Sequence, residues 1–457
     1  MKRRNQDMLR GPLLGGIITY TIPIILTSIL QLLFNAADLV VVGRYCGSIS
    51  VAAVGATGSI TALIVNLFVG LSVGAGVTVA HGVGSREDAV VHRTVHTAIP
   101  MALVSGVVLT VVGVLFSGTF LEWMGTPENV MKLSTVYMRI YFAGITFTMV
   151  YNFAASILRA VGDTKSPLIF LTIAGVINVV LNVFFVTRLH MNVAGVALAT
   201  TISQGVSAAA MVIVLMRRTD AARLCLKKLR FYMPQMLKMI RIGLPAGVQS
   251  SLFSISNVLI QSSVNSFGDV LMSGNAASQN LESFLYASMN SFHQTAVNYI
   301  GQNVGAKQYD RVKRIVWICL GSVAVLGLAM GTGMCVFGEH LLGIYITDSQ
   351  EAISWGLIRL YIICQAYFIC GLMDVSTGAL RGMGASISPM IISVLGVCGI
   401  RIGWIMTIFK LPRFHTPQSL YYSYIFSWTV TFLIQICAFV IVYRRHRQRL
   451  NSGKTLH

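Results

Sequence analysis

The sequence predicts an all-α polytopic membrane protein with twelve transmembrane helices, arranged in two homologous lobes of six helices each. The first observation is composition: hydrophobic residues make up 55% of the 457 residues and charged residues only 11%, whereas soluble domains contain about 25% charged residues. The second is the recurrence of apolar stretches of about 20 residues or more, each long enough to cross a bilayer. The third is an internal repeat, which indicates that two related halves make up the chain.

The repeat is visible in segments that return in the same order. The stretch ILRAVGDTKSP, which ends at Pro167, returns as ALRGMGASISP, which ends at Pro389. Likewise HGVGSREDAVVHR, which begins at His81, returns as QNVGAKQYDRVKR, which begins at Gln302. An even number of spans in each half lets both halves enter the membrane from the same side. We therefore expect a pseudo-twofold axis along the membrane normal and a binding cavity between the lobes.

Each predicted span is an apolar run that short polar or glycine-containing turns separate from its neighbours. The twelve spans are expected at 15–43, 51–80, 94–119, 134–160, 167–188, 193–217, 238–266, 274–304, 313–341, 356–381, 388–411 and 419–443. We assign residues 1–216 to the N-lobe and 238–443 to the C-lobe. Residues 217–237 form a basic cytoplasmic linker, and 444–457 form a basic cytoplasmic tail.

Lysine and arginine indicate the orientation of the chain. They gather in the N-terminal MKRRNQDMLR, in the linker and in the RRHRQR tail. The positive-inside rule then places both termini in the cytoplasm. This bias accounts for the net charge of +19, so we expect no nucleic-acid partner. The linker is expected to be an amphipathic segment at the membrane surface, in contact with anionic lipid.

Other classes of function have little support in the sequence. The eight cysteines are scattered, mostly within spans, and no CxxC pair occurs, so we interpret them as packing residues rather than metal or redox sites. No phosphate-binding loop of the GxxxxGK[ST] kind is present. We therefore expect neither an enzyme nor an ATP-driven pump. The expected activity is transport, driven by an ion gradient or passive.

Polar residues inside the spans carry the functional information, because each is costly in lipid. In the first span, Gln31, Asn35 and Asp38 recur at helical spacing and so share one face. Asp38 is expected to couple transport to a cation or proton, and Gln31 and Asn35 are expected to line a substrate cavity. The alternative for Asp38 is a structural carboxylate that is paired with an arginine.

Two other spans of the N-lobe offer partners for Asp38. Asn178 and Asn182 lie four residues apart on one face of the fifth span, and the sixth span contributes Thr200. One carboxylate with several neutral oxygens can bind a small hard cation, or can hold a proton whose affinity an apolar setting raises. We predict a coupling site composed of Asp38, Asn178, Asn182 and Thr200.

The C-lobe repeats the polar stripe of the first span without its acid. Asn257 stands at the position of Asn35, but Ile260 stands at that of Asp38, with Gln261 beside it. The N-lobe alone is therefore expected to hold the ion site. Asn257 and Gln261 are expected to line the substrate cavity.

Two C-lobe acids lie inside other spans: Glu282, in the eighth, and Asp374, in the tenth. Asn152 is the N-lobe counterpart of Asp374. We predict that Glu282, Asp374 and Asn152 line the cavity, where an acid can meet a cationic substrate. The alternative is that an acid pairs with Arg401, and Glu282 is expected to lie closer to Arg401 in depth.

These features together resemble the multidrug and toxic compound extrusion (MATE) family, in its prokaryotic form. The most specific marks are IPIILTSILQLLFNAADLVVVGR, the LRAVGDTKSP turn and the asparagine-rich span that follows it. The resemblance implies an efflux transporter of a bacterial cell membrane that exports organic, often cationic, amphipathic compounds in exchange for H+ or Na+. By the same resemblance, Asp38 looks like the first-helix acid of the N-lobe cation site, with Asn178 and Thr200 as oxygen-bearing partners.

The sequence departs from the family pattern at Asn182, where well-known prokaryotic members have a second aspartate. The pocket then has one formal negative charge, which weakens the case for Na+. A glutamate that the sodium-coupled branch carries in the seventh span is also not evident among the apolar and serine residues from Leu252 to Ser256. Both ions remain open, with H+ slightly favoured, and the only metal considered is Na+ at Asp38. No cofactor is expected.

The expected mechanism is alternating access. Pro23 lacks an amide hydrogen, so the first span can bend there as a hinge. The partners are small amphipathic or cationic drugs and the lipid bilayer, and we expect a monomer. The main alternative is a lipid-linked oligosaccharide flippase of the same superfamily. Flippases of that kind usually have fourteen spans and a basic groove.

Overall fold

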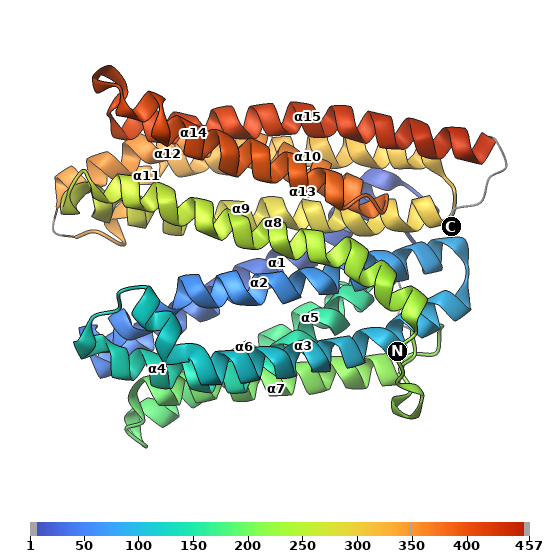
Figure 1. Cartoon of the computed structure of the whole chain (residues 1–457), viewed down its shortest axis with the longest axis horizontal. Coiled ribbons are helices and arrows are strands. Elements are labelled where there is room, and N and C mark those ends of the chain that lie inside the picture. Colours follow the sequence, from blue (N-terminus) through green and yellow to red (C-terminus); the bar gives the residue numbers. More distant parts are fainter. Residues whose placement is uncertain (1–6, 348, 452–457) are drawn as a thin grey trace. The chain divides into compact units, whose positions relative to one another are not determined.

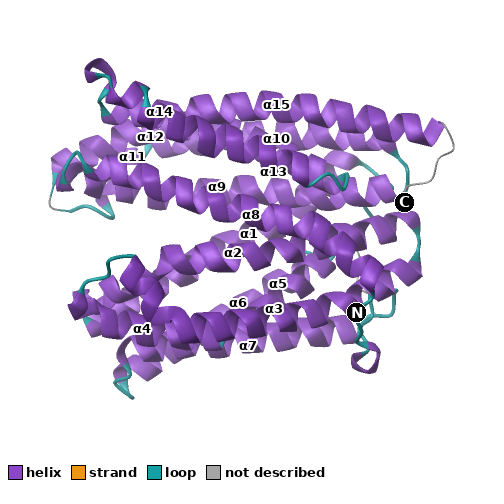
Figure 2. Ribbon diagram, viewed as in Figure 1, coloured by secondary structure: helices purple, strands orange, loops and turns teal. Residues whose placement is uncertain are grey.

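The computed structural model describes residues 7–347 and 349–451, and this part of the chain contains helices and connections but no strand (Figures 1 and 2). The elements are α1 (Leu13–Cys46), α2 (Ser48–Ser85), α3 (Asp88–Trp123), α4 (Glu128–Ala143), α5 (Ile145–Ala160), α6 (Lys165–Thr187), α7 (Asn192–Met216), η1 (Leu226–Lys228), α8 (Met233–Asn265), α9 (Asp269–Gly305), α10 (Tyr309–Val336), α11 (Gly338–Gly343), α12 (Gln350–Gly382), α13 (Ile387–Ser393), η2 (Val394–Gly399), α14 (Ile400–Met406), η3 (Ile408–Lys410), η4 (Pro412–Phe414) and α15 (Pro417–Asn451).

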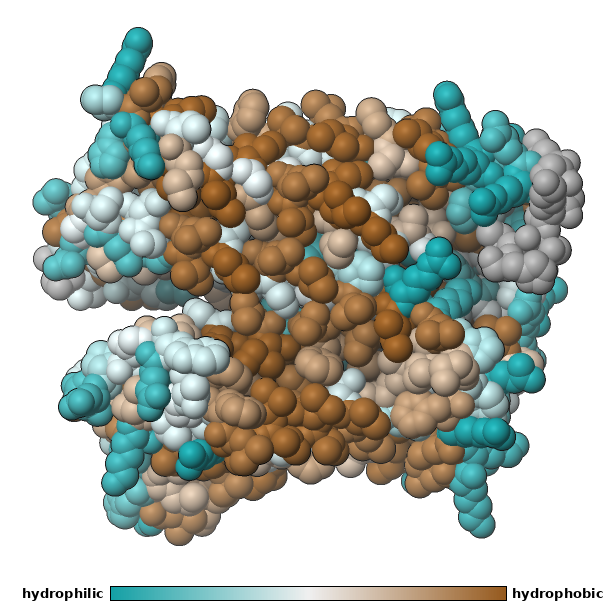
Figure 3. Space-filling view, in the orientation of Figure 1, coloured by the Kyte–Doolittle hydropathy of each residue, from teal (hydrophilic) through white to brown (hydrophobic). Residues whose placement is uncertain are grey.

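Length and hydropathy support the predicted membrane spans. Among the described residues, nine helical segments are long and apolar enough to cross a membrane, and the bent pair α4 and α5 brings the number to ten. The helices α8 and α9 have 33 and 37 residues, so they also have the required length, although they carry more polar side chains. In Figure 3 the surface is hydrophobic along the middle of the helices and hydrophilic at their ends. The fold class of an all-α membrane protein with twelve spans is confirmed.

Two predicted spans are not continuous α-helices. The span expected at 134–160 breaks at Gly144, where α4 and α5 meet at 46°. Gly144 lies against α7, because a Cβ atom there would come within 2.4 Å of the Thr201 side chain. The span expected at 388–411 contains a π-helical segment, η2, between α13 and α14. At the C-terminus, α15 continues to Asn451, so the first residues of the predicted basic tail are helical.

The chain folds into two compact units whose boundaries lie inside helices. Unit 1 is built from Ile22–Ser251, whereas unit 2 is built from Met8–Thr21 and the described residues that follow Ser251. The first part of α1 therefore belongs to unit 2, and the first part of α8 belongs to unit 1. Each half of the sequence thus gives the start of its first helix to the unit that the other half forms.

Glycines let the start of α8 pack closely against α2 within unit 1. A Cβ atom on Gly74 of α2 would lie 2.0 Å from the carbonyl oxygen of Met239, and one on Gly70 would lie 2.2 Å from the backbone nitrogen of Gly247. Gly243 is similarly close to the backbone of α2. Small residues four apart on both helices let the two backbones approach closely, which is a common mode of helix packing in membranes.

Different contacts hold the start of α1 within unit 2. The Thr21 and Thr295 hydroxyls are hydrogen-bonded at 2.8 Å. The rings of Tyr20 and Tyr299 meet edge to face, with centroids 5.4 Å apart. Further toward the N-terminus, the buried Asn303 amide donates to the carbonyl oxygen of Met8 at 3.1 Å. Polar and aromatic side chains of α9 thus anchor this segment.

The linker between α7 and α8 contains only the short turn η1 and lies against α3. The Cys225 amide donates to Nε2 of His96 at 3.0 Å, and the Tyr232 amide donates to the Thr97 hydroxyl at 3.1 Å. His96 is fully buried. Hydrogen bonds to unit 1 therefore fix the linker, and its contact with anionic lipid stays a prediction.

A buried ion pair joins α9 to α12 in unit 2. The Arg359 guanidinium, 1% exposed, donates to both carboxylate oxygens of Glu282, at 2.6 and 2.8 Å. It also donates to the Asn275 side-chain oxygen at 2.8 Å and lies 5.2 Å from the centre of the Tyr421 ring. The bidentate geometry and the extra partners compensate for the removal of both charges from water.

The glycine contact between α2 and α8 can be tested with one methyl group. Gly74→Ala is expected to lower the free energy of unfolding by about 1–3 kcal/mol, because the Met239 carbonyl must move away. Gly58→Ala on the same helix is the matched control, since nothing lies within 4 Å of its Cβ position and alanine favours helices. Thermal unfolding of both variants in detergent measures the difference. Equal stability of the two would contradict the close contact.

Loss of one partner of the ion pair should destabilise the protein strongly, and substitution of the other partner should recover part of that stability. Glu282→Gln leaves the buried Arg359 without its carboxylate and is expected to cost about 3–5 kcal/mol. The double variant Glu282→Gln with Arg359→Gln should recover part of this loss, because no charge is then left unpaired. Glu339→Gln, at an exposed acid of α11, is the control. Unchanged unfolding of Glu282→Gln would show that the pair contributes little.

Candidate functional site

Three helices of unit 1 bring the predicted coupling residues together. Asp38 lies in the C-terminal half of α1, Asn178 and Asn182 lie one turn apart on α6, and Thr200 lies on α7. The two asparagines are buried, with 4% and 0% exposure, and Asp38 is half-buried. Helical spacing thus places four polar side chains at one point between α1, α6 and α7. We call these four residues the Asp38 cluster.

Hydrogen bonds connect all four members of the Asp38 cluster. The Asn182 amide nitrogen donates to Oδ1 of Asp38 and also to the Asn178 side-chain oxygen, the latter at 3.2 Å. The Asn178 amide nitrogen donates to the Thr200 hydroxyl at 3.2 Å. The Thr200 hydroxyl lies 3.4 Å from Oδ2 of Asp38 and 3.0 Å from the Val196 carbonyl oxygen, and its single hydrogen can serve either.

Neutral groups, rather than an arginine, surround the Asp38 carboxylate. Within the described residues, none of the ion pairs includes Asp38, so the alternative of a carboxylate paired with arginine does not hold here. The side-chain oxygen of Asn182 is buried and has no hydrogen-bond partner in the described part of the chain. One turn away, the apolar residues Val186 and Val196 belong to a buried cluster. The site therefore combines one carboxylate, one unused oxygen and an apolar wall.

Other predicted residues of unit 1 lie outside the Asp38 cluster. Gln31 and Asn35 are exposed on α1 and lie on the helix face that carries Asp38. Asn152 is half-buried on α5, and its amide donates to the Thr148 carbonyl oxygen of the same helix at 2.8 Å. Pro23 is buried within α1, which continues through it as one helix.

In unit 2 the counterpart of the coupling site is a different structure. Ile260, at the position of Asp38, is 1% exposed. Asn257 is exposed. The Gln261 side chain is hydrogen-bonded to Asn265 at 2.8 Å, to Asn275 at 3.2 Å and to Gln279 at 3.3 Å. An amide network takes the place of a carboxylate site.

The intramembrane acids of unit 2 differ in their surroundings. Glu282 pairs with Arg359 and not with Arg401, which corrects the pairing expected from depth alone. Arg401 instead donates to the Ser427 hydroxyl at 3.1 Å and lies 4.0 Å from the centre of the Tyr424 ring. Asp374 is 7% exposed, and its Oδ2 atom lacks a hydrogen-bond partner among the described residues.

Sequence reasoning missed Arg359 as a functional neighbour. Arg359 lies close to the start of the predicted span 356–381. The helix α12 begins earlier, at Gln350, so Arg359 is well inside it and within reach of α9. The sequence offered one signal of a polar site on α9. Asn275 and Glu282 are seven residues apart, which places them on one face of that helix. Both side chains contact Arg359. In the described residues, no group of three or more His, Cys, Asp or Glu side chains could hold a metal.

Comparison with known proteins gives consistent results over most of the chain. A family model described as MatE matches residues 23–184 and 245–405. The probable multidrug resistance protein YpnP of Bacillus subtilis (strain 168) is 28% identical over 402 residues, which cover 86% of this chain and 88% of that protein. The probable multidrug resistance protein YoeA of the same organism is 25% identical over 391 residues, which cover 84% of each.

A solved structure has the same fold. It is described as the outward-facing conformation of a multidrug resistance MATE family transporter of the MOP superfamily, and it aligns with a TM-score of 0.91 and 18% identity, over 98% of this chain and 100% of that one. The two matches to the MatE family model begin at Pro23 and Pro245, which stand near the start of the two homologous halves. The chain therefore belongs to the multidrug and toxic compound extrusion (MATE) family, and it is a membrane transporter rather than an enzyme.

Proposed function

We propose that this protein is a secondary active multidrug efflux antiporter that exports organic, often cationic, amphipathic compounds in exchange for H+ or Na+. The observation that carries the proposal is the Asp38 cluster, in which neutral amides and a hydroxyl hold a carboxylate inside the membrane. The names of the relatives YpnP and YoeA, probable multidrug resistance proteins, support drugs as the cargo. The proposed location is a bacterial cell membrane, with both termini cytoplasmic and the protein a monomer.

The Asp38 cluster can couple transport because its hydrogen bonds depend on charge. A charged Asp38 accepts from Asn182 and Thr200, whereas a protonated Asp38 has an O–H group that must donate. Asn182 can meet that change by turning its amide, so that its unused oxygen accepts. The two protonation states then favour different packing of α1 against α6 and α7. Coupling follows where these packings belong to conformations that differ in affinity for the drug.

The composition of the Asp38 cluster favours H+ over Na+ as the coupling ion. A hard cation prefers oxygen ligands and carboxylate charge. Here the site has a single carboxylate, and the Asn182 amide nitrogen, a donor, occupies one of its oxygens. Asn178, Asn182 and Thr200 could still supply oxygens to Na+ after rearrangement. The proton needs no such rearrangement of several ligands.

Pro23 is the proposed hinge of the transport cycle. It lies just beyond the point, between Thr21 and Ile22, where α1 passes from unit 2 to unit 1. Without an amide hydrogen, Pro23 leaves one helical carbonyl without its donor, which lowers the cost of bending. The anchored residues before the hinge can then stay with unit 2 while the residues around Asp38 adjust.

The proposed substrate contacts follow from exposure and position. Gln31 and Asn35 are exposed on the Asp38 face of α1, so a drug that reaches them is close to the coupling site. Asn152, Asn257, Gln261 and Asp374 remain proposed cavity residues. Glu282 is left out, because its carboxylate is engaged with Arg359.

Transport with separately imposed gradients tests the proposed function. Vesicles that contain the purified protein and ethidium are given either a proton gradient or a Na+ gradient, and efflux is followed by fluorescence. Uphill efflux with the proton gradient is expected. If neither gradient drives uphill efflux beyond that of empty vesicles, the proposal of coupled ethidium export is wrong. The pathway would then be passive or the cargo a different compound.

Removal of the Asp38 charge should uncouple transport without unfolding the protein. Asp38→Asn keeps the shape of the side chain, so we expect a membrane-inserted protein of near-normal stability and at least a tenfold loss of gradient-driven efflux. Asp88→Asn, at an exposed acid at the start of α3, is the matched control and should transport normally. Near-normal uphill efflux by Asp38→Asn would remove Asp38 from the coupling role.

A second carboxylate should change the ion preference. Asn182→Asp places two acids at the site and is expected to increase the dependence of efflux on Na+, because an added carboxylate favours a hard cation. Asn66→Asp, on α2 and outside both the Asp38 cluster and the proposed cavity residues, serves as the control. Sodium titrations of the three proteins in the same vesicles make the comparison. Superimposable curves would place Asn182 outside the ion site.

A further inference from the structure

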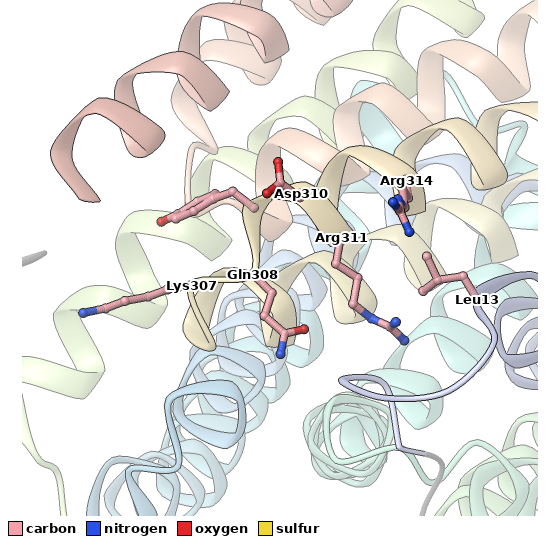
Figure 4. Close-up of a pocket in the computed structure, with 7 residues that line it drawn as sticks. Leu13, Lys307, Gln308, Asp310, Arg311 and Arg314 are labelled. Carbon is pink, nitrogen blue, oxygen red and sulfur yellow. The ribbon is translucent and has the colours of Figure 1, made fainter. Parts of the chain in front are cut away.

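A cavity lies where the turn between α9 and α10 meets the start of α1, in unit 2. It has a volume of about 400 Å³. Its lining consists of Leu13, Lys307, Gln308, Tyr309, Asp310, Arg311 and Arg314. Figure 4 shows Arg311, Arg314 and Leu13 on one side of the turn, while Lys307 extends to the other side. This cavity is remote in sequence from the Asp38 cluster and has no part in the proposed coupling.

The charge of the cavity is strongly positive. Lys307, Arg311 and Arg314 line it together with a single acid, Asp310. That acid already has a basic partner, because the Arg447 guanidinium of α15 lies 3.5 Å from its carboxylate. The positive charge of the three lining residues is thus not balanced within the cavity, and an anion is the ligand that fits it.

The wall of the cavity is held in place before any ligand arrives. Both terminal nitrogens of Arg311 donate to the Gly11 carbonyl oxygen at 3.2 Å. A carbonyl is a neutral acceptor, so these bonds fix the guanidinium and leave its charge uncompensated. Lys307 has a φ of 58°, a left-handed conformation that glycine normally supplies at the end of a helix. A basic side chain thus occupies a strained position of the turn.

The cavity lies at the first turns of α10, a helix that is long and apolar enough to cross a membrane. Trp317, three residues after Arg314 on α10 and so on the same face, is 66% exposed. Exposed tryptophan at the end of a spanning helix marks the interface between lipid and water. Leu13, the first residue of α1, adds an apolar surface to the cavity. An anion bound beside Arg314 therefore lies where lipid phosphates are found.

We propose that this cavity binds the phosphate of an anionic phospholipid, with Arg314 and Arg311 beside the phosphate and Leu13 beside the glycerol and the first acyl carbons. Phosphate is the shared chemistry of lipid headgroups and of soluble phosphate compounds, and the apolar wall at interfacial depth favours the lipid. Arginine suits this role, because its planar fork matches two phosphate oxygens. Such a lipid would tie the start of α1 to α10.

The test uses the full-length protein in detergent, titrated with dioctanoyl phosphatidylglycerol and followed by native mass spectrometry and thermal unfolding. Arg314→Gln is expected to bind this lipid about fivefold more weakly, the effect of one basic residue at an anionic surface. Lys313→Gln is the matched control: it removes one charge from the same helix turn, but Lys313 is exposed and does not line the cavity. Its binding should equal that of the unaltered protein.

Three separate results would overturn the proposal. Equal weakening by Lys313→Gln and Arg314→Gln would mean that only the general charge of the surface attracts the lipid. A rise in unfolding temperature with inorganic phosphate alone, lost in Arg314→Gln, would assign the cavity to a soluble phosphate compound. Dioctanoyl phosphatidylcholine, which has a phosphate but no net charge, should bind more weakly than phosphatidylglycerol, and equal binding would contradict the role of charge.

Discussion

The cost of a carboxylate inside a membrane explains the surroundings of two acids, one in each unit. In unit 2, Glu282 offsets this cost by pairing with Arg359, and the two opposite charges are in bidentate contact. In unit 1, the partners of Asp38 are amides and a hydroxyl, which form hydrogen bonds but carry no charge. A carboxylate with neutral partners can gain or lose a proton or a cation without leaving an opposite charge stranded. The same physical constraint thus gives a structural cross-link in one unit and, in the function that we propose, a responsive site in the other.

The two units also show how duplicated halves came to differ. The starts of α1 and α8 occupy equivalent positions in the repeat, and each packs in the unit formed mainly by the other half. In unit 1 that contact is between backbones, through Gly70, Gly74 and Gly243. In unit 2 it is between side chains, through the Thr21–Thr295 hydrogen bond and the Tyr20–Tyr299 rings. Duplication preserved the position of the contact and changed its chemistry.

Much of this could be predicted from the sequence, because the membrane leaves few alternatives. Apolar length gave the spans closely: the fifth was expected at 167–188, and α6 covers Lys165–Thr187. Helical spacing placed Asn178 and Asn182 on one face, and the cost of polar groups in lipid suggested Asp38 as their partner. The partner of Glu282 was not predictable in the same way, because periodicity describes one helix and not which helix packs beside it. The break at Gly144 and the π-helical segment before Arg401 also depend on contacts with neighbouring helices, which a hydropathy pattern does not contain.

The packing of the start of α1 in unit 2, which the second half of the chain mainly forms, has a consequence for biogenesis. Residues 8–21 find partners on α9, at Thr295, Tyr299 and Asn303, which the ribosome makes only after the whole first half of the chain. This segment is therefore made well before the partners with which it docks. A nascent chain that stops before α9 lacks these partners and cannot form the contacts that hold residues 8–21 in unit 2.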